Sequence, residues 1–153
     1  MKAYIFGEQE KNDTGFTHKY VIPYTDMTST AGTGLTVTLD TYTAGTQFKD
    51  AAHKVVTAFD GGATSELTLK VGYDGATTDN DDGLIEAVSI HVDATEVLYG
   101  GANGADFATK LNGYTALDAG ILTATFTATG ANLTALTTGE VHIYVKRVDL
   151  TKY

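Results

Sequence analysis

Apolar and polar residues alternate strictly along five separate stretches of the chain. These stretches lie at 35–40, 67–71, 88–92, 122–129 and 141–146. Successive side chains of a β-strand point to opposite faces, so this pattern predicts strands with one buried face and one outward face. Five segments with the same period indicate an all-β domain.

Shorter apolar segments fill the intervals between turn-rich stretches. They predict further strands at 2–6, 19–24, 53–59 and 95–100, and the turns are expected at 30–34, 60–65, 74–83, 100–104 and 129–132. About eight to ten short strands are typical of an antiparallel β-sandwich or a jelly-roll-like fold. Helical signals are weak: 104–114 could form a short helix or turn, and 131–140 one helical turn.

The first thirty residues differ in composition from the rest. Residues 1–30 are charged and aromatic, whereas 31–139 are dominated by Thr, Gly and Ala. Two interpretations are open: an N-terminal arm that packs on a neighbouring molecule, or an ordinary edge strand with a loop. Residues 31–153 then form the β-sandwich, in what we expect to be a single domain overall.

The amino-acid composition favours strands and argues against some classes of binding partner. Threonine makes up roughly a sixth of the chain and suits pleated sheets, while 17 glycines serve turns and proline occurs once. A formal net charge of −9 argues against binding to nucleic acid or to an anionic membrane, both of which select basic patches. The apolar run at 1–13 is too short for a signal peptide, no later segment is long enough to span a bilayer, and we expect a soluble protein.

No residue pattern predicts catalysis. Cysteine is absent, and the four histidines are not spaced for a joint metal site. Two of them, His91 and His142, fall on faces that the alternation predicts to be polar and solvated. The serines lack a nucleophile-elbow context, and neither a phosphate-binding nor a dinucleotide-binding glycine motif is present. We therefore expect a protein that is not an enzyme and uses no cofactor.

One acidic cluster merits comparison with calcium sites. It comprises Asp74, Asp79, Asp81 and Asp82, within a stretch that also contains glycine. Closely spaced carboxylates suit Ca²⁺, but the spacing does not match the helix-loop-helix pattern and the closing glutamate is missing. Asp, Asn and Gly are also common in plain turns. A solvated loop and a weak Ca²⁺ site both remain open.

Aromatic residues are the remaining resource for binding. The chain has nine Tyr and six Phe, and aromatic side chains are enriched in protein interfaces. They could equally cap the edge of the core. The interface candidates are Tyr4, Phe6, Phe16, Tyr20, Tyr24 and Tyr144. Tyr144 is the sharpest of these, because it shares the outward face of the last predicted strand with His142 and Lys146.

Three stretches resemble a known class of protein. The segments TAFDGGATSELTLKVGYDGA (57–76), DGLIEAVSIHVDATEVLYGGANG (82–104) and TATFTATGANLTALTTGEVHIYVKRVD (123–149) are similar to small virion proteins of tailed bacteriophages. That class includes capsid decoration (cement) proteins and head or tail fibre modules. The resemblance spans 50–150 and consists of turn-and-strand patterns, not of a catalytic signature.

The resemblance implies a structural virion protein that decorates a phage capsid and stabilises it by binding between capsid subunits. It further implies the major capsid protein as partner, a homo-oligomer with a trimer favoured, and a place on the capsid exterior after assembly in the host cytoplasm. The alternative is a fibre- or adhesin-type module that recognises glycan or Ca²⁺. The resemblance does not cover residues 1–30, where we would look for the capsid contact.

Overall fold

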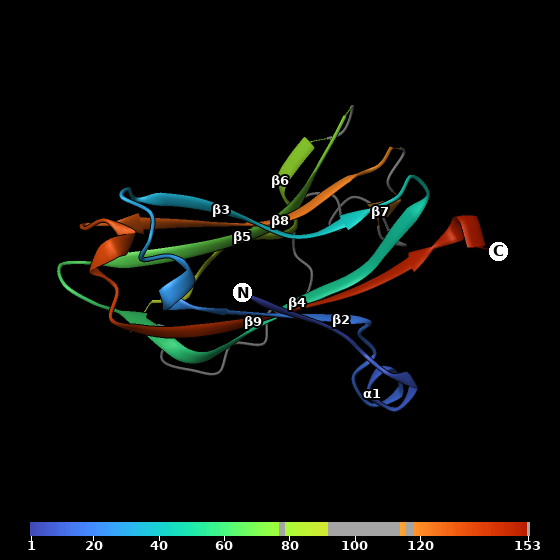
Figure 1. Ribbon diagram of the computed structural model, residues 1–153, viewed down its shortest axis with the longest axis horizontal. Coiled ribbons are helices and arrows are strands. Elements are labelled where there is room, and N and C mark those ends of the chain that lie inside the picture. The colour runs from blue at the N-terminus through green and yellow to red at the C-terminus, as the bar shows by residue number, and fades with distance from the viewer. Residues whose placement is uncertain (77–78, 92–113, 116–117, 153) are drawn as a thin grey trace.

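Two antiparallel sheets pack face to face in the computed structural model, which describes residues 1–76, 79–91, 114–115 and 118–152 (Figure 1). One sheet has the strand order β1 (Lys2–Ile5), β2 (His18–Pro23), β9 (Thr138–Asp149), β4 (Thr46–Asp60) and β7 (Tyr114–Thr115). The other has the order β3 (Gly34–Tyr42), β8 (Gly120–Thr129), β5 (Glu66–Gly75) and β6 (Asp79–Ser89). The predicted all-β sandwich is confirmed.

The strand pairs are nested along the chain. β2 pairs with β9, β3 with β8, β4 with β7 and β5 with β6, all antiparallel. Strands 2 to 5 therefore alternate between the two sheets, and their partners return in reverse order. The four nested strand pairs are thus divided equally between the two sheets of the sandwich. β1 is added at the edge, beside β2.

The core lies between the sheets and is built from the alternating residues. Val141, Ile143 and Val145 of β9 are fully buried, as are Leu69 of β5 and Phe126 of β8. Burial of each side chain of this size contributes about 1.5–3 kcal/mol to the stability of the folded protein. The strands predicted at 35–40, 67–71, 122–129 and 141–146 are thus confirmed, with the apolar set inward in each.

Several boundaries differ from those predicted. The stretch 74–83 is not a continuous turn, because β5 runs to Gly75 and β6 begins at Asp79. β4 begins at Thr46, before the predicted 53–59, and the alternating stretch at 88–92 leaves its strand at Ser89. Residues typical of turns hid the strand ends within 74–83. β-bulges near both ends of β4 interrupt its alternation and hid the true length of that strand. The predicted strand at 95–100 and most of the segment 104–114 lie outside the described residues.

Short helices cap the sandwich. The 3₁₀ turn η2 (Leu133–Ala135) agrees with the helical turn predicted within 131–140, and η1 (Tyr24–Asp26) and η3 (Leu150–Lys152) are of similar length. The helix α1 (Glu8–Thr14) was not predicted. It buries no residue, so it has no apolar periodicity to detect. Its N-terminus is instead held by the Glu10 carboxylate, which accepts a hydrogen bond from the Gly7 amide at 3.0 Å.

The first thirty residues supply β1, α1, β2 and η1. β2 lies inside the five-stranded sheet, hydrogen-bonded to β1 on one side and β9 on the other. β1 is an edge strand, and all four of its residues are exposed. Whether this edge also acts as an arm on a neighbouring molecule stays a prediction, as does the division of the chain at residue 30.

We predict that Gly139→Ala destabilises the sandwich strongly. Gly139 has φ +135°, and a Cβ atom there would lie 2.2 Å from Cδ1 of the fully buried Phe59 ring. The clash and the unfavourable backbone should together lower the free energy of unfolding by about 2–4 kcal/mol. Gly32→Ala is the matched control, since a Cβ atom at Gly32 meets no atom within 4 Å. Equal denaturation midpoints for the two variants would contradict this packing.

Candidate functional site

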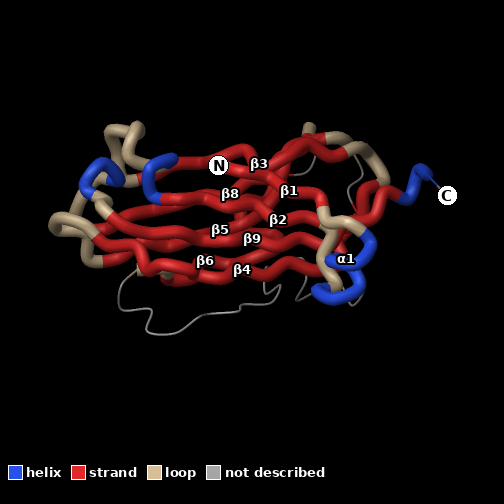
Figure 2. The backbone as a smooth tube through the Cα atoms, turned by 60° about the horizontal axis from the view of Figure 1, so that its bottom comes forward, coloured by secondary structure: helices blue, strands red, loops and turns tan. Residues whose placement is uncertain are grey.

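The outer face of the five-stranded sheet carries an aromatic and basic surface built from two adjacent rows of residues. Strand register places Tyr4, Lys19, Tyr144 and Ala52 side by side across β1, β2, β9 and β4. The next row is Lys2, Val21, His142 and Lys54. Figure 2 shows these strands lying alongside one another. Their chain neighbours in β2 and β9 point into the core, so strand alternation turns these side chains outward.

Tyr144 is the centre of an aromatic cluster on this face. Its ring centroid lies 6.4 Å from that of Phe6 and 5.7 Å from that of Phe16, both in tilted arrangements. The Lys19 ammonium lies 5.8 Å from the Tyr144 ring centroid and 6.0 Å from that of Tyr4. Tilted rings and a cation over a ring face are both attractive. Four of the six predicted interface candidates therefore come together here.

The other two candidates lie elsewhere. Tyr20 is fully buried between the sheets, where its hydroxyl donates to Asp40 Oδ2 at 3.3 Å. Burial also raises the pKa of Tyr20 well above its usual range. Tyr24 opens η1 and packs, partly buried, against the core. Tyr20 does not reach the cluster around Tyr144, because alternate positions of β2 face opposite sides of the sheet, and Tyr24 lies beyond the end of β2.

We name the outer-face patch by its members: Lys2, Tyr4, Phe6, Phe16, Lys19, Lys54, His142, Tyr144 and Lys146. Alternation placed Lys146 and His142 on the outward face with Tyr144, whereas Lys2, Lys19 and Lys54, and the contact of His142 with Glu140, were missed in the sequence. His142 was expected to be solvated, but its ring is half-buried and its Nε2 lies 2.8 Å from Glu140 Oε1. The signal that could have found the lysines was positional parity. Lys146 lies two residues after Tyr144 in β9, and Lys19 is the register partner of Tyr144 in β2.

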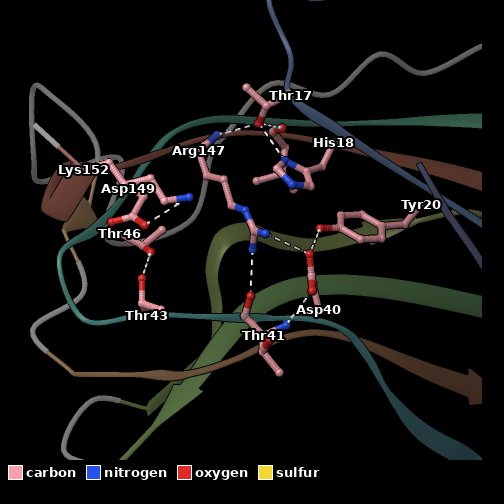
Figure 3. A network of polar contacts seen from close by, with 11 residues as sticks. Thr17, His18, Tyr20, Asp40, Thr41, Thr43, Thr46, Arg147, Asp149 and Lys152 are labelled. Carbon is pink, nitrogen blue, oxygen red and sulfur yellow. Dashed lines mark hydrogen bonds and ion pairs between the residues drawn. The ribbon is translucent and has the colours of Figure 1, made fainter. Parts of the chain in front are cut away.

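A polar network joins the two sheets at one end of the sandwich (Figure 3). Arg147 of β9 places Nη2 3.0 Å from Asp40 Oδ2 of β3, and its Nη1 donates to the Thr41 carbonyl at 2.9 Å. Its amide donates to Thr17 Oγ1 at 3.0 Å, and that hydroxyl also contacts His18 Nδ1 at 2.7 Å. The ion pair between Arg147 and Asp40 connects β9 to β3. The network therefore fixes the separation of the two sheets where the apolar core ends.

A hollow of about 620 Å³ opens beside this network, but its charges are already engaged. Among its lining residues, Lys11 pairs with Glu8, Arg147 with Asp40 and Lys152 with Asp149. Hydrogen bonds from Thr151 hold the pKa of Asp149 below its ordinary value. The charged side chains that line the hollow are therefore already paired with carboxylates of this chain.

Three histidines are buried, including one predicted to be exposed. His91 was expected on a polar face, yet it is 4% exposed, because the chain leaves β6 and bridges to Phe59 of β4. Burial, followed by the nearby Arg147 cation, lowers the pKa of His18 to about 4. Burial likewise lowers the pKa of His53, whose two ring nitrogens have no hydrogen-bond partner among the described residues.

The acidic residues proposed as a weak Ca²⁺ site lie on the β5–β6 hairpin. Asp74 and Asp79 are register partners, Asp81 pairs with Lys70 at 3.4 Å, and the Asp82 amide donates to Asn80. Within the described part of the chain, no three His, Asp or Glu residues are grouped so as to hold a metal ion. The described helices include none that is long and apolar enough to cross a membrane.

Comparisons with known proteins gave one structural likeness. No protein-family model matches the chain, and no curated protein matches it. A chain of the acidic stable capsid structure of Helicobacter pylori bacteriophage KHP30 is similar at 15% identity, with 85% of this chain and 92% of that chain covered and a TM-score of 0.42. A score of this size does not establish a common fold.

We predict that His18 makes the fold sensitive to acid. Its pKa is about 4 in the native state against 6.5 unfolded, so between these values the unfolded chain binds a proton that the native chain does not. Stability is then full above pH 6.5 and falls as the pH drops toward 4. The groups around the ring are Arg147 from β9, Asp40 from β3 and Lys11 from α1.

The test compares wild type with His18→Gln in urea denaturation at pH 7.5 and pH 5. The wild type should lose about 1–2 kcal/mol more than the variant over this interval. Thr17→Ser, which keeps the hydroxyl contact to His18, is the matched control and should titrate like the wild type. The same loss in His18→Gln as in wild type would show that the acid sensitivity arises elsewhere.

Proposed function

We propose that this chain is a structural virion protein that decorates a phage capsid and stabilises it by binding between capsid subunits. Its partner is the major capsid protein, its place is the capsid exterior, and it acts as a homo-oligomer with a trimer favoured. The virion assignment begins from the resemblance of the segments at 57–76, 82–104 and 123–149 to small phage virion proteins.

The nested strand order supports this class of function. Jelly rolls are used repeatedly in viral capsid and lectin domains. The two sheets pack over a buried apolar core, which leaves their outer faces and edges as surfaces for binding. Fold alone does not determine function. It narrows the choice to proteins that bind through a face or an edge.

The observation that carries the proposal is the outer-face patch. Tyr4, Phe16 and Tyr144 remain partly or largely exposed although their rings are held together. Aromatic side chains on a sheet lose little conformational entropy on binding and bury a large area. Interface hot spots are enriched in such side chains. Strand register aligns Tyr4 and Tyr144 through Lys19, and the Phe16 ring packs against Tyr144, before any partner arrives. A rigid, exposed aromatic face suits a protein that works by contact.

The charged groups elsewhere serve stability rather than reaction chemistry. Arg147, Asp40 and Tyr20 bind one another across the sheets, and Thr17 links them to His18. A general acid or base must face a substrate with a proton to give or accept. In this network the titratable side chains face one another, which favours a binding role over an enzymatic one.

A glycan-binding module is the second candidate, favoured by the same patch. Sugars stack on exposed tyrosine rings, and lectin domains share the jelly-roll architecture. The two candidates differ in what the patch contacts: a protein lattice on the particle, or an oligosaccharide away from it. A glycan array probed with the purified chain separates them, since a specific sugar ligand without particle association would favour the second.

Mass spectrometry of purified virus particles tests the proposal directly. We predict the chain in a fixed ratio to the major capsid protein, together with saturable binding of the purified chain to capsid shells that lack it. Absence from particles and no affinity for shells would overturn the assignment.

Replacement of Tyr144 should then weaken shell binding without unfolding the chain. Tyr144→Ala removes the ring shared by Phe6 and Phe16 on the outward face. We expect about a tenfold rise in the dissociation constant, the range of a moderate hot spot. Thr127→Ala, at an exposed position on the opposite sheet, is the control and should bind like wild type. Equal losses in both variants would argue against the patch.

A further inference from the structure

One side of β1 is an open edge of the five-stranded sheet. β1 pairs with β2 in a register without shifts, and within the described part of the chain its other side has no neighbouring strand (Figure 2). Natural edge strands are usually shielded by charged side chains, proline, a β-bulge or a covering segment. β1 has one charged residue, Lys2, but neither proline nor a bulge, and all of its residues are exposed. The outer side of β1 can therefore accept another strand.

The backbone groups of Ala3 and Ile5 point to this open side. Beside β1, the Phe6 amide donates to the Thr17 carbonyl at 3.0 Å. Alternate residues of an antiparallel strand direct their amides and carbonyls to the same neighbour, so the even-numbered residues of β1 face β2. Ala3 and Ile5 then face away from β2. Outside the β1–β2 ladder, no backbone hydrogen bond between described residues engages either of them.

Exposed apolar side chains gather at the same place. Five large apolar side chains of the described residues are exposed, and three of them are Met1, Tyr4 and Ile5. Ile5 is the most exposed of the five, at 77%. Single apolar residues on a surface are ordinary, whereas a group of them beside unpaired backbone marks a contact site.

This edge is complementary to a second copy of itself. In an antiparallel pair centred on Tyr4, Ala3 lies opposite Ile5 of the other copy, and the two residues exchange both hydrogen bonds. The two-fold axis repeats this exchange, so every outward amide and carbonyl of β1 is used. Lys2 lies opposite Phe6 of the other copy and not opposite a second Lys2, so like charges are not paired. On the core-facing side, the large Ile5 side chain meets the small one of Ala3.

The same arrangement aligns the two outer-face patches. The two-fold axis of an antiparallel pair within one sheet is perpendicular to that sheet, so the outer faces of both copies point in the same direction. The two Tyr4 side chains lie next to each other at the junction of the patches. A single shell can then contact both patches at once.

We propose that two copies of this chain associate through β1, antiparallel and centred on Tyr4, so that their five-stranded sheets join into one. This inference rests on the homo-oligomer of the proposed function and identifies its contact. An antiparallel pair of identical strands joins two copies and no more. The oligomer is then a two-fold pair instead of the trimer that the resemblance favours.

Cysteine cross-linking tests the register, because the chain has no cysteine of its own. Opposite residues of a non-hydrogen-bonded pair have Cα atoms about 4.5 Å apart, a separation that a disulfide spans. Under mild oxidation, Tyr4→Cys should form a covalent dimer at least about tenfold faster than Thr127→Cys, at an exposed position of the four-stranded sheet. Ala3→Cys is the register control, since the two copies of residue 3 are diagonal neighbours about 7–8 Å apart.

A proline at residue 3 tests the backbone contact. The Ala3 amide points away from β2, so Ala3→Pro removes hydrogen bonds between copies and keeps the β1–β2 ladder. In analytical ultracentrifugation, its dimer dissociation constant should rise at least about tenfold. Ala3→Ser keeps the amide and should stay within about twofold of wild type. Circular dichroism checks that each variant folds, and the cross-link decides the question if Ala3→Pro does not.

Wild type with the mass of two chains supports this inference. A monomer or a trimer overturns it, as does equal association of Ala3→Pro and wild type. Cross-linking of Tyr4→Cys no faster than that of Thr127→Cys, or slower than that of Ala3→Cys, overturns the arrangement centred on Tyr4. If a monomeric or trimeric wild type still binds capsid shells, the proposed capsid role stands. Pairs that cross-link at Tyr4→Cys but do not bind shells overturn the capsid role and leave this contact standing.

Discussion

The register of β9 between β2 and β4 is the constraint on which the rest of the structure depends. β9 is hydrogen-bonded along both edges, and its alternate residues Val141, Ile143 and Val145 fill the core. A shift of one residue would move every side chain to the opposite face. The same register that buries these residues therefore sends Tyr144 and its neighbours outward. The core and the outer-face patch are therefore formed by the two faces of one strand.

The two sheets are held together by the apolar core and, at one end, by the polar network around Arg147. Over most of the sandwich, apolar side chains interdigitate. At the open end, Arg147 reaches from β9 to Asp40 of β3, and Tyr20 closes the network from β2. A half-buried ion pair contributes little unless its geometry is good and its other donors are satisfied. Here the Thr41 carbonyl satisfies the remaining guanidinium edge, so the pair fixes the alignment of the two sheets.

The sequence predicted what period-two alternation controls. Fold class, most strands and the outward position of Tyr144 followed from single-strand patterns. Strand order did not, because pairing between segments as distant as β2 and β9 leaves no local signal. For the same reason the convergence of Phe6 and Phe16 on Tyr144 was not predictable. His91 was misplaced because alternation was extended past the end of β6, and α1 was missed because it buries nothing.

In the proposed function, the five-stranded sheet binds the capsid and the four-stranded sheet faces solvent. A cryo-electron microscopy reconstruction of the virus particle tests this orientation directly. The account predicts density for this chain on the capsid exterior, with β1, β2, β9 and β4 against the shell and β3, β8, β5 and β6 facing outward. A reconstruction in which the four-stranded sheet contacts the shell, while Tyr144 and Lys146 face solvent, would contradict it.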